Sequence, residues 1–78
     1  MVIGEIERND TERLRIEASN YKGSDFISVR IYYLADNGEW RPTKKGITVK
    51  PEKVDELIGF LSEAKEKAGT IEAEKEEG

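Results

Sequence analysis

Aromatic and basic side chains are concentrated between Tyr21 and Val49, and together they have the chemistry to hold a single strand of nucleic acid. An aromatic ring can stack on any base, at about 1–3 kcal/mol per stacked base, and lysine and arginine displace the counterions of phosphates. Residues 13–50 include eight basic and four acidic side chains, although the whole chain carries a charge of −4. The residues after Lys50 include four lysines and nine acids. This asymmetry predicts one face that binds nucleic acid and an opposite, solvated face whose negative charge repels it.

The sequence lacks the residue types on which most enzymes and metal sites depend. It has no Cys and no His, so disulfides, thiolate zinc sites and the commonest general base are excluded. No Ser lies in a nucleophile-elbow context, and the glycines do not form a phosphate-cradling G-x-x-x-x-G-K-[ST] loop. We therefore predict that the chain is not an enzyme and that it has no metal site and no cofactor.

Two segments in the first half of the chain have the pattern of half-buried strands. Residues 14–18 alternate between apolar and polar side chains. Residues 26–34 are rich in β-branched and aromatic side chains and form the strongest strand prediction. A turn over residues 20–25 is expected to join them, because Gly23 can adopt a positive φ without a Cβ clash.

The chain is then expected to return to the sheet through two further turns. The sequence Asp36-Asn37-Gly38 is typical of a hairpin turn. Trp40 begins a return strand, which Pro42 should end or bend because proline lacks the N–H donor. A short strand over residues 47–49 follows.

A helix is predicted from Pro51 to about residue 68, since proline suits the first helical position. We expect its apolar stripe to cover the back of the sheet, and we expect Gly59 and Phe60 to allow contact with a neighbouring chain. The stripe comprises Val54, Leu57, Ile58, Leu61 and Ala64.

The predicted organisation is a single domain with two short flanking segments. Residues 1–12 are expected to form a short arm or edge strand, residues 13–68 the domain, and residues 69–78 an acidic, disordered tail. No apolar run approaches the roughly 20 residues of a membrane span, and we find no secretory signal. We therefore expect the protein in the cytoplasm, associated with the nucleoid, or in the nucleus if the source is a eukaryote.

Three motifs in this order resemble the DNA-binding domain of the positive cofactor four family of transcriptional coactivators. They are Tyr21-Lys22-Gly23, ISVRIYY at residues 27–33 and GEWRPTKKGI at residues 38–47. The family pattern is aromatic-K-G, I-D-I-R-x-Y-aromatic and G-E-x-K-P-x-K-K-G-I-S, and the match covers residues 14–61. Four residues depart from the common pattern: Ser19, Ser24, Thr43 and Val54.

The resemblance implies an α+β fold, in which a curved, four-stranded antiparallel sheet is followed by one C-terminal helix. It also implies a homodimer with basic channels for single-stranded DNA, little sequence preference and a role in transcription, replication or repair. The small size of the chain independently favours pairing with a second copy. The residues expected to contact DNA are Tyr21, Lys22, Arg30, Tyr33, Arg41, Lys44 and Lys45. Those expected at the dimer interface are Tyr32, Gly59 and Phe60.

The pattern alone leaves alternatives open at several of these positions. Tyr33 has the parity of the apolar residues in its strand, so it is a core residue unless a bulge or strong twist turns it outward. Lys44 and Lys45 also fit an ordinary solvated turn. Arg30 lies in mid-strand and needs a partner, which is either a carboxylate such as Glu17 or a bound phosphate.

Two other functions fit the same sequence. An RNA-binding module would use the same face, because contacts to the 2′-hydroxyl depend on positioned side chains that the sequence does not locate. A protein-interaction module would dock through the acidic helix, for example on transcription or replication machinery, while the sheet supports the helix.

Overall fold

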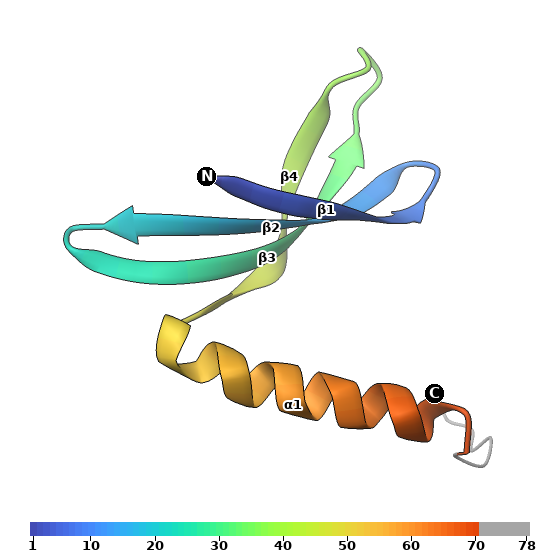
Figure 1. Cartoon of the computed structure of the whole chain (residues 1–78). Coiled ribbons are helices and arrows are strands. Elements are labelled where there is room, and N and C mark those ends of the chain that lie inside the picture. The colour runs from blue at the N-terminus through green and yellow to red at the C-terminus, as the bar shows by residue number, and fades with distance from the viewer. Residues whose placement is uncertain (71–78) are drawn as a thin grey trace.

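A computed structural model describes residues 1–70 of the 78-residue chain, and it has four strands followed by one helix (Figure 1). The strands form one antiparallel sheet in the order β1-β2-β3-β4, so each strand pairs with its neighbour in the sequence. This α+β architecture confirms the predicted fold. The elements are β1 Val2–Asn9, β2 Glu12–Tyr21, β3 Ser24–Leu34, β4 Trp40–Val49 and α1 Pro51–Ala68.

The register of the strands divides the sheet into two faces of different chemistry. Leu14 lies opposite Ile31, and Ile16 lies opposite Val29, so the apolar side chains of β2 and β3 share one face. The apolar face comprises Ile6, Leu14, Ile16, Ala18, Ile27, Val29, Ile31, Ile47 and Val49. The polar face carries Glu5, Glu7, Arg13, Arg15, Glu17, Arg30 and Tyr32.

The N-terminal residues belong to the sheet. The amino group of Met1 donates to the carbonyl oxygen of Ala18 at 2.9 Å, and the Ala18 N–H donates to the Met1 carbonyl oxygen at 2.9 Å. A register shift between Val2 and Gly4 interrupts the alternation of β1, which explains the weak pattern in this segment. The sheet therefore begins at Val2, and β1 is one of its edge strands.

Strand β4 differs from the sequence prediction because it continues through Pro42. The prediction divided this segment into a strand start at Trp40 and a short strand at residues 47–49, but one strand covers both. Pro42 pairs with Tyr32 of β3. Proline is tolerated here because β4 lies at the edge of the sheet, where no further strand needs its N–H.

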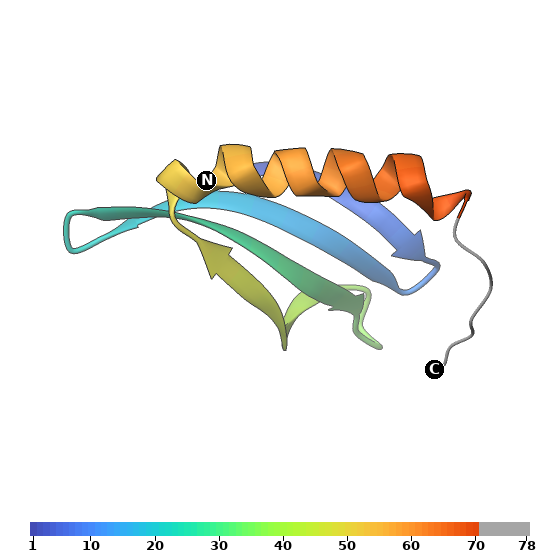
Figure 2. The same cartoon turned by 90° about the horizontal axis from the view of Figure 1, so that it is seen from below.

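Helix α1 leaves the end of β4 and runs beside the sheet as a straight rod (Figures 1 and 2). Val54 and Leu57 are half-buried, whereas Ile58 and Leu61 are 54% and 60% exposed. The expectation that the whole apolar stripe covers the sheet is therefore wrong beyond its first turns. Residues 69 and 70 of the predicted tail form the turn that ends α1, and residues 71–78 of that tail lie outside the described residues.

Candidate nucleic-acid interface

A two-residue turn joins β2 to β3 and carries two of the predicted contact residues. Lys22 and Gly23 have φ angles of 53° and 83°, the combination of positive values that a type I′ turn requires. The Asn20 side chain holds the turn, since its oxygen accepts from the Gly23 N–H at 3.3 Å and its amide donates to Asp25 at 2.7 Å. Tyr21 is 64% exposed, and Lys22 Nζ lies 5.4 Å from its ring centre. The turn thus presents an open ring beside a cation.

A bulge in β4 presents the two predicted lysines. Only Ile31 separates Arg30 from Tyr32 along β3, but the partners of these two residues in β4 are four positions apart. Residues 43–45 therefore form what we call the β4 bulge. The bulge ends at Gly46, which pairs with Arg30. This position suits glycine, because a Cβ here would lie only 2.9 Å from a backbone oxygen of β3.

Side-chain hydrogen bonds hold the first residue of the β4 bulge in place. Thr43 Oγ1 donates to the Ile31 carbonyl oxygen at 2.7 Å and accepts from the Lys45 N–H at 3.1 Å. Arg30 Nη1 donates to the Thr43 carbonyl oxygen at 2.9 Å. The side chains of Lys44 and Lys45 are exposed. They therefore extend from a backbone whose position is fixed.

Arg30 has a partner that the sequence analysis did not consider. The two partners expected for it were the Glu17 carboxylate and a phosphate, but its guanidinium group donates to the backbone carbonyl of Thr43. Arg30 is half-buried on the polar face. One of its five N–H groups makes this bond, so the side chain both braces the β4 bulge and keeps further donors.

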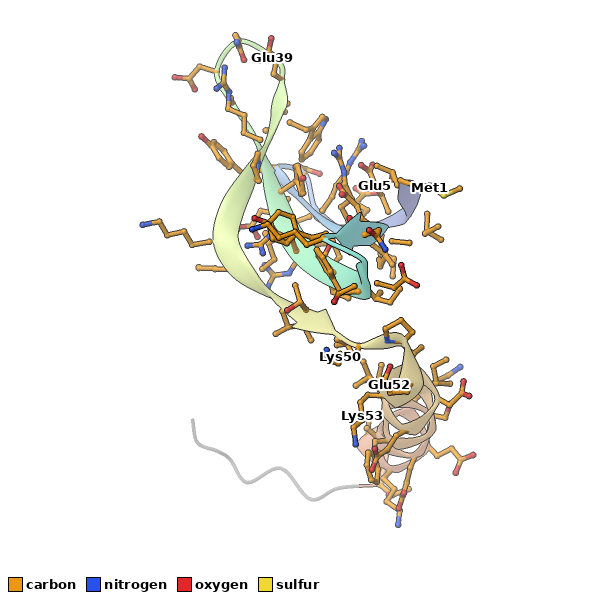
Figure 3. The ribbon with its side chains drawn as sticks, turned by 90° about the vertical axis from the view of Figure 1, so that its left-hand side faces the viewer. Met1, Glu5, Glu39, Lys50, Glu52 and Lys53 are labelled. Carbon is orange, nitrogen blue, oxygen red and sulfur yellow. The ribbon has the colours of Figure 1, made fainter. Side chains whose placement is uncertain are left out.

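Tyr33 and Arg41 lie directly opposite each other in the β3–β4 pair. Tyr33 is 41% exposed, even though its parity is that of the apolar face. Arg41 forms an exposed ion pair of 3.0 Å with Glu39, which Figure 3 shows at the tip of the β3–β4 hairpin. Along β3, Tyr33 is nine residues from Ser24, the partner of Tyr21. The two tyrosines therefore lie at opposite ends of the β2–β3 hairpin, about 30 Å apart along the strand.

The polar face also contains two arginines stacked on aromatic rings, which the sequence analysis did not single out. The Cζ atom of Arg13 lies 4.2 Å from the centre of the Trp40 ring, and that of Arg15 lies 3.9 Å from the centre of the Tyr32 ring. Both guanidinium groups also bind the Glu5 carboxylate of β1. Hydrogen bonds from Arg15 and then Arg13 lower the pKa of Glu5. The contacts with Glu5 follow from the register of β1 on β2, which the sequence does not reveal.

A family model described as Transcriptional Coactivator p15 (PC4) matches residues 8–59, which is two thirds of the chain. The chain belongs to the PC4 family. This match confirms the resemblance found in the sequence motifs. Members of the family are non-catalytic DNA-binding proteins, and this confirms the prediction that the chain is not an enzyme.

Solved structures of other PC4 homologues share this fold. One from Burkholderia pseudomallei is 29% identical, with a TM-score of 0.79, and the match covers 83% of this chain and 88% of that chain. MoSub1, solved in complex with DNA, is 27% identical, with a TM-score of 0.58 and coverage of 96% and 90%. A bacteriophage T5 homologue implicated in recombination-dependent DNA replication has a TM-score of 0.60 over 90% and 78% of the two chains. At 21% identity, it supports the fold alone.

The three residues that the PC4 resemblance suggested for a dimer interface lie in two separate places. Tyr32 is half-buried on the polar face, where its hydroxyl donates to Glu17 at 3.4 Å. Gly59 and Phe60 lie on α1, where Phe60 is 63% exposed and a Cβ on Gly59 would meet no atom within 4 Å. Gly59 and Phe60 are therefore accessible to a second copy, whereas Tyr32 makes its contacts within the sheet of one copy.

Residues 1–70 contain no cluster of three or more acidic side chains arranged to hold a metal ion. Over the same residues, no helix combines the length and apolarity needed to cross a membrane.

Proposed function

We propose that this chain is a homodimeric single-stranded-DNA-binding protein that holds exposed strands with little sequence preference during transcription, replication or repair. The observation that carries the proposal is the β4 bulge, where Lys44 and Lys45 are exposed on a backbone fixed by Thr43 and Arg30. A DNA complex of the related MoSub1 supports the same class of ligand.

The chemistry of the exposed residues fits a single strand better than a duplex. Tyr21 and Tyr33 offer rings on which unpaired bases can stack, and stacking does not depend on base identity. Lys22, Lys44 and Lys45 are exposed cations that can follow a phosphate backbone. Among residues 1–70, the ion pair of the Arg41 side chain is an exposed one with Glu39, which a phosphate can replace.

Pairing of two copies accounts for the apolar surface that one copy leaves open. Among residues 1–70 no side chain is fully enclosed, so a single copy has no closed core. On α1, Ile58, Phe60 and Leu61 are 54%, 63% and 60% exposed. A domain of this size without disulfides needs such a staple. A stable folded monomer at micromolar concentration, detected by sedimentation, would contradict the homodimer.

Fluorescence anisotropy of a labelled oligo-dT, titrated at several salt concentrations, tests DNA binding directly. We expect a log–log slope of roughly −2 to −5, which corresponds to about three to seven neutralised phosphates at about −0.7 per contact on single strands. The double variant Lys44→Gln/Lys45→Gln should weaken binding to all sequences alike and flatten the slope.

The double variant Lys53→Gln/Lys65→Gln is the matched control, because it removes the same charge from exposed positions on α1. Equal effects of the two double variants would mean that net charge alone drives binding, and would refute a role for the β4 bulge. No binding by the unmodified protein at low salt would refute the proposed function itself.

The open apolar residues of α1 also favour a second function, docking of a protein partner on the helix. Failure to bind oligonucleotides, combined with capture of a partner that a Phe60 variant loses, would support this alternative. Parallel titration with oligo-U of equal length separates DNA from RNA preference.

A further inference from the structure

Arg13 and Arg15 hold one carboxylate with two separate donors. Arg13 Nη1 lies 2.9 Å from Oε1 of Glu5, and Arg15 Nε lies 2.7 Å from Oε2. A phosphodiester also presents two charged or partly charged oxygens on one centre, and guanidinium groups recognise phosphate and carboxylate by the same geometry. The Glu5 carboxylate therefore occupies a ready-made anion site.

The two guanidinium groups are held in place by more than Glu5. The Cζ atom of Arg13 lies 4.2 Å from the ring centre of Trp40, and that of Arg15 lies 3.9 Å from the ring centre of Tyr32. Stacking fixes the plane of a guanidinium group but leaves its edge donors available. The site is thus expected to keep its shape when the carboxylate is removed.

The anion site lies on the polar face, next to residues already assigned to the interface. Arg15 is the direct cross-strand partner of Arg30, which braces the β4 bulge. Glu5 comes from the edge strand β1, away from the start of α1 that Glu52 marks in Figure 3. The side chains of Arg13 and Arg15 are 40% and 23% exposed, so a ligand in solvent can reach them.

We propose that Arg13 and Arg15 form a phosphate subsite for single-stranded nucleic acid, and that Glu5 occupies it in the free protein as an internal competitor. On binding, a backbone phosphate replaces the Glu5 carboxylate between the two arginines. Partly exposed ion pairs stabilise a fold only weakly, so the exchange is accessible. This inference rests on the proposed single-strand binding. It adds one phosphate subsite to that function, and it makes Glu5 a residue that lowers the affinity of the free protein for the strand.

A comparison of Glu5→Gln with Glu7→Gln in the oligo-dT titration tests the subsite. Glu7 lies on the same strand and face but takes part in none of the ion pairs among residues 1–70, so its variant removes the same charge without opening the subsite. One extra phosphate contact should steepen the salt slope of Glu5→Gln by about 0.7 and tighten binding about fivefold at 0.1 M salt. Adding Arg13→Gln and Arg15→Gln to Glu5→Gln should abolish the gain.

The outcomes separate this inference from the proposed function. Absence of binding by the unmodified protein at low salt refutes the proposed function. Binding by the unmodified protein, with equal effects of Glu5→Gln and Glu7→Gln or with weaker binding by Glu5→Gln, overturns the subsite. Should Glu5→Gln fail to fold, the Nε–H resonances of Arg13 and Arg15 in the unmodified protein give the answer. These resonances must shift when oligo-dT is added, and unchanged resonances overturn the subsite as well.

Discussion

The hydroxyl of Thr43 makes two of the hydrogen bonds that shape the β4 bulge, to the Ile31 carbonyl oxygen and from the Lys45 N–H. A glycine at this position would give a flexible backbone instead of an anchored one. In this chain, the lysines are therefore expected to lose less conformational freedom on binding than they would beside glycine.

Replacing Thr43 with valine tests the anchor, because valine has a similar shape but no hydroxyl. We expect the free energy of unfolding to fall by about 1–2 kcal/mol, since the bond to the Ile31 carbonyl oxygen is partly buried. We expect oligo-dT binding to weaken as well, by about threefold to tenfold, because ordering the lysines then costs more free energy. Thr43→Ser keeps the hydroxyl and should restore most of both losses. Equal binding by the valine variant and the unmodified protein would show that the hydroxyl does not position the lysines.

The ion pairs of Glu5 predict a loss of stability in acid. Hydrogen bonds from Arg15 and Arg13 lower its pKa in the folded state. The Glu5 carboxylate therefore binds a proton more readily in the unfolded chain than in the folded chain. The stability that these ion pairs contribute is fully present above the unfolded pKa of Glu5, and it is lost as the pH falls through the lower, folded pKa. Urea unfolding at pH 7 should show Glu5→Gln less stable than the unmodified protein, with the difference shrinking towards pH 3. A difference of the same size at both pH values would exclude this linkage.

At the scale of single elements, the β2–β3 turn combines backbone strain with a predicted DNA contact. Lys22 has a φ of 53°, a left-handed conformation that lysine rarely adopts and that asparagine and glycine adopt readily. Strain that persists at an exposed cation suggests that the turn is shaped for the position of that cation.

Replacing Lys22 with asparagine should therefore separate stability from binding. We expect the free energy of unfolding to rise by about 0.5–1 kcal/mol, because asparagine suits a type I′ turn. We expect oligo-dT binding to weaken and the salt slope to flatten by about 0.7, the contribution of one phosphate contact. Chemical denaturation and anisotropy measure the two effects. A variant that gains stability and binds as tightly as the unmodified protein would remove Lys22 from the interface.

The elements differ in how far the sequence could predict them. Strands β2 and β3 and the Gly23 turn were predictable because alternation and turn chemistry are local properties. The β4 bulge was not, since it depends on how β4 pairs with Arg30 and Tyr32 of another strand. The same reason hid the contacts of Arg15 with Glu5, because neither residue reveals the register of β1 on β2. Local pattern thus located the turn and the lysines, whereas the partner of Arg30 required the structure.

For the whole molecule, the decisive feature is the surface between α1 and the sheet. The radius of gyration is 15.3 Å, whereas a compact domain of this length has about 11 Å. The contacts of α1 with the sheet are mainly with β3, and the apolar face of the sheet remains only partly covered. An extended molecule with no enclosed side chain among residues 1–70 supports the proposed homodimer.

Phe60→Asp tests the proposed homodimer, because it replaces the most exposed large apolar side chain of α1 with a charge. Burial of a phenylalanine side chain contributes about 1.5–3 kcal/mol, so the variant should weaken association of two copies by roughly tenfold to a hundredfold. Sedimentation over a range of concentrations measures the change. Ser62→Asp adds the same charge two residues, about 200°, further round the helix, and should leave association nearly unchanged.

Because a single copy has no closed core, Phe60→Asp should also lower the thermal unfolding midpoint measured at equal protein concentration, whereas the midpoint of Ser62→Asp should follow that of the unmodified protein. The oligo-dT titration then connects assembly with binding. If both sheets of a dimer hold one strand, a dissociated variant should show a flatter salt slope. This change is expected even though the DNA-contacting residues of each single copy are the same as before. A Phe60→Asp protein that stays dimeric at every concentration would place the contact between copies elsewhere, and the open apolar residues of α1 would then be the site for a different protein.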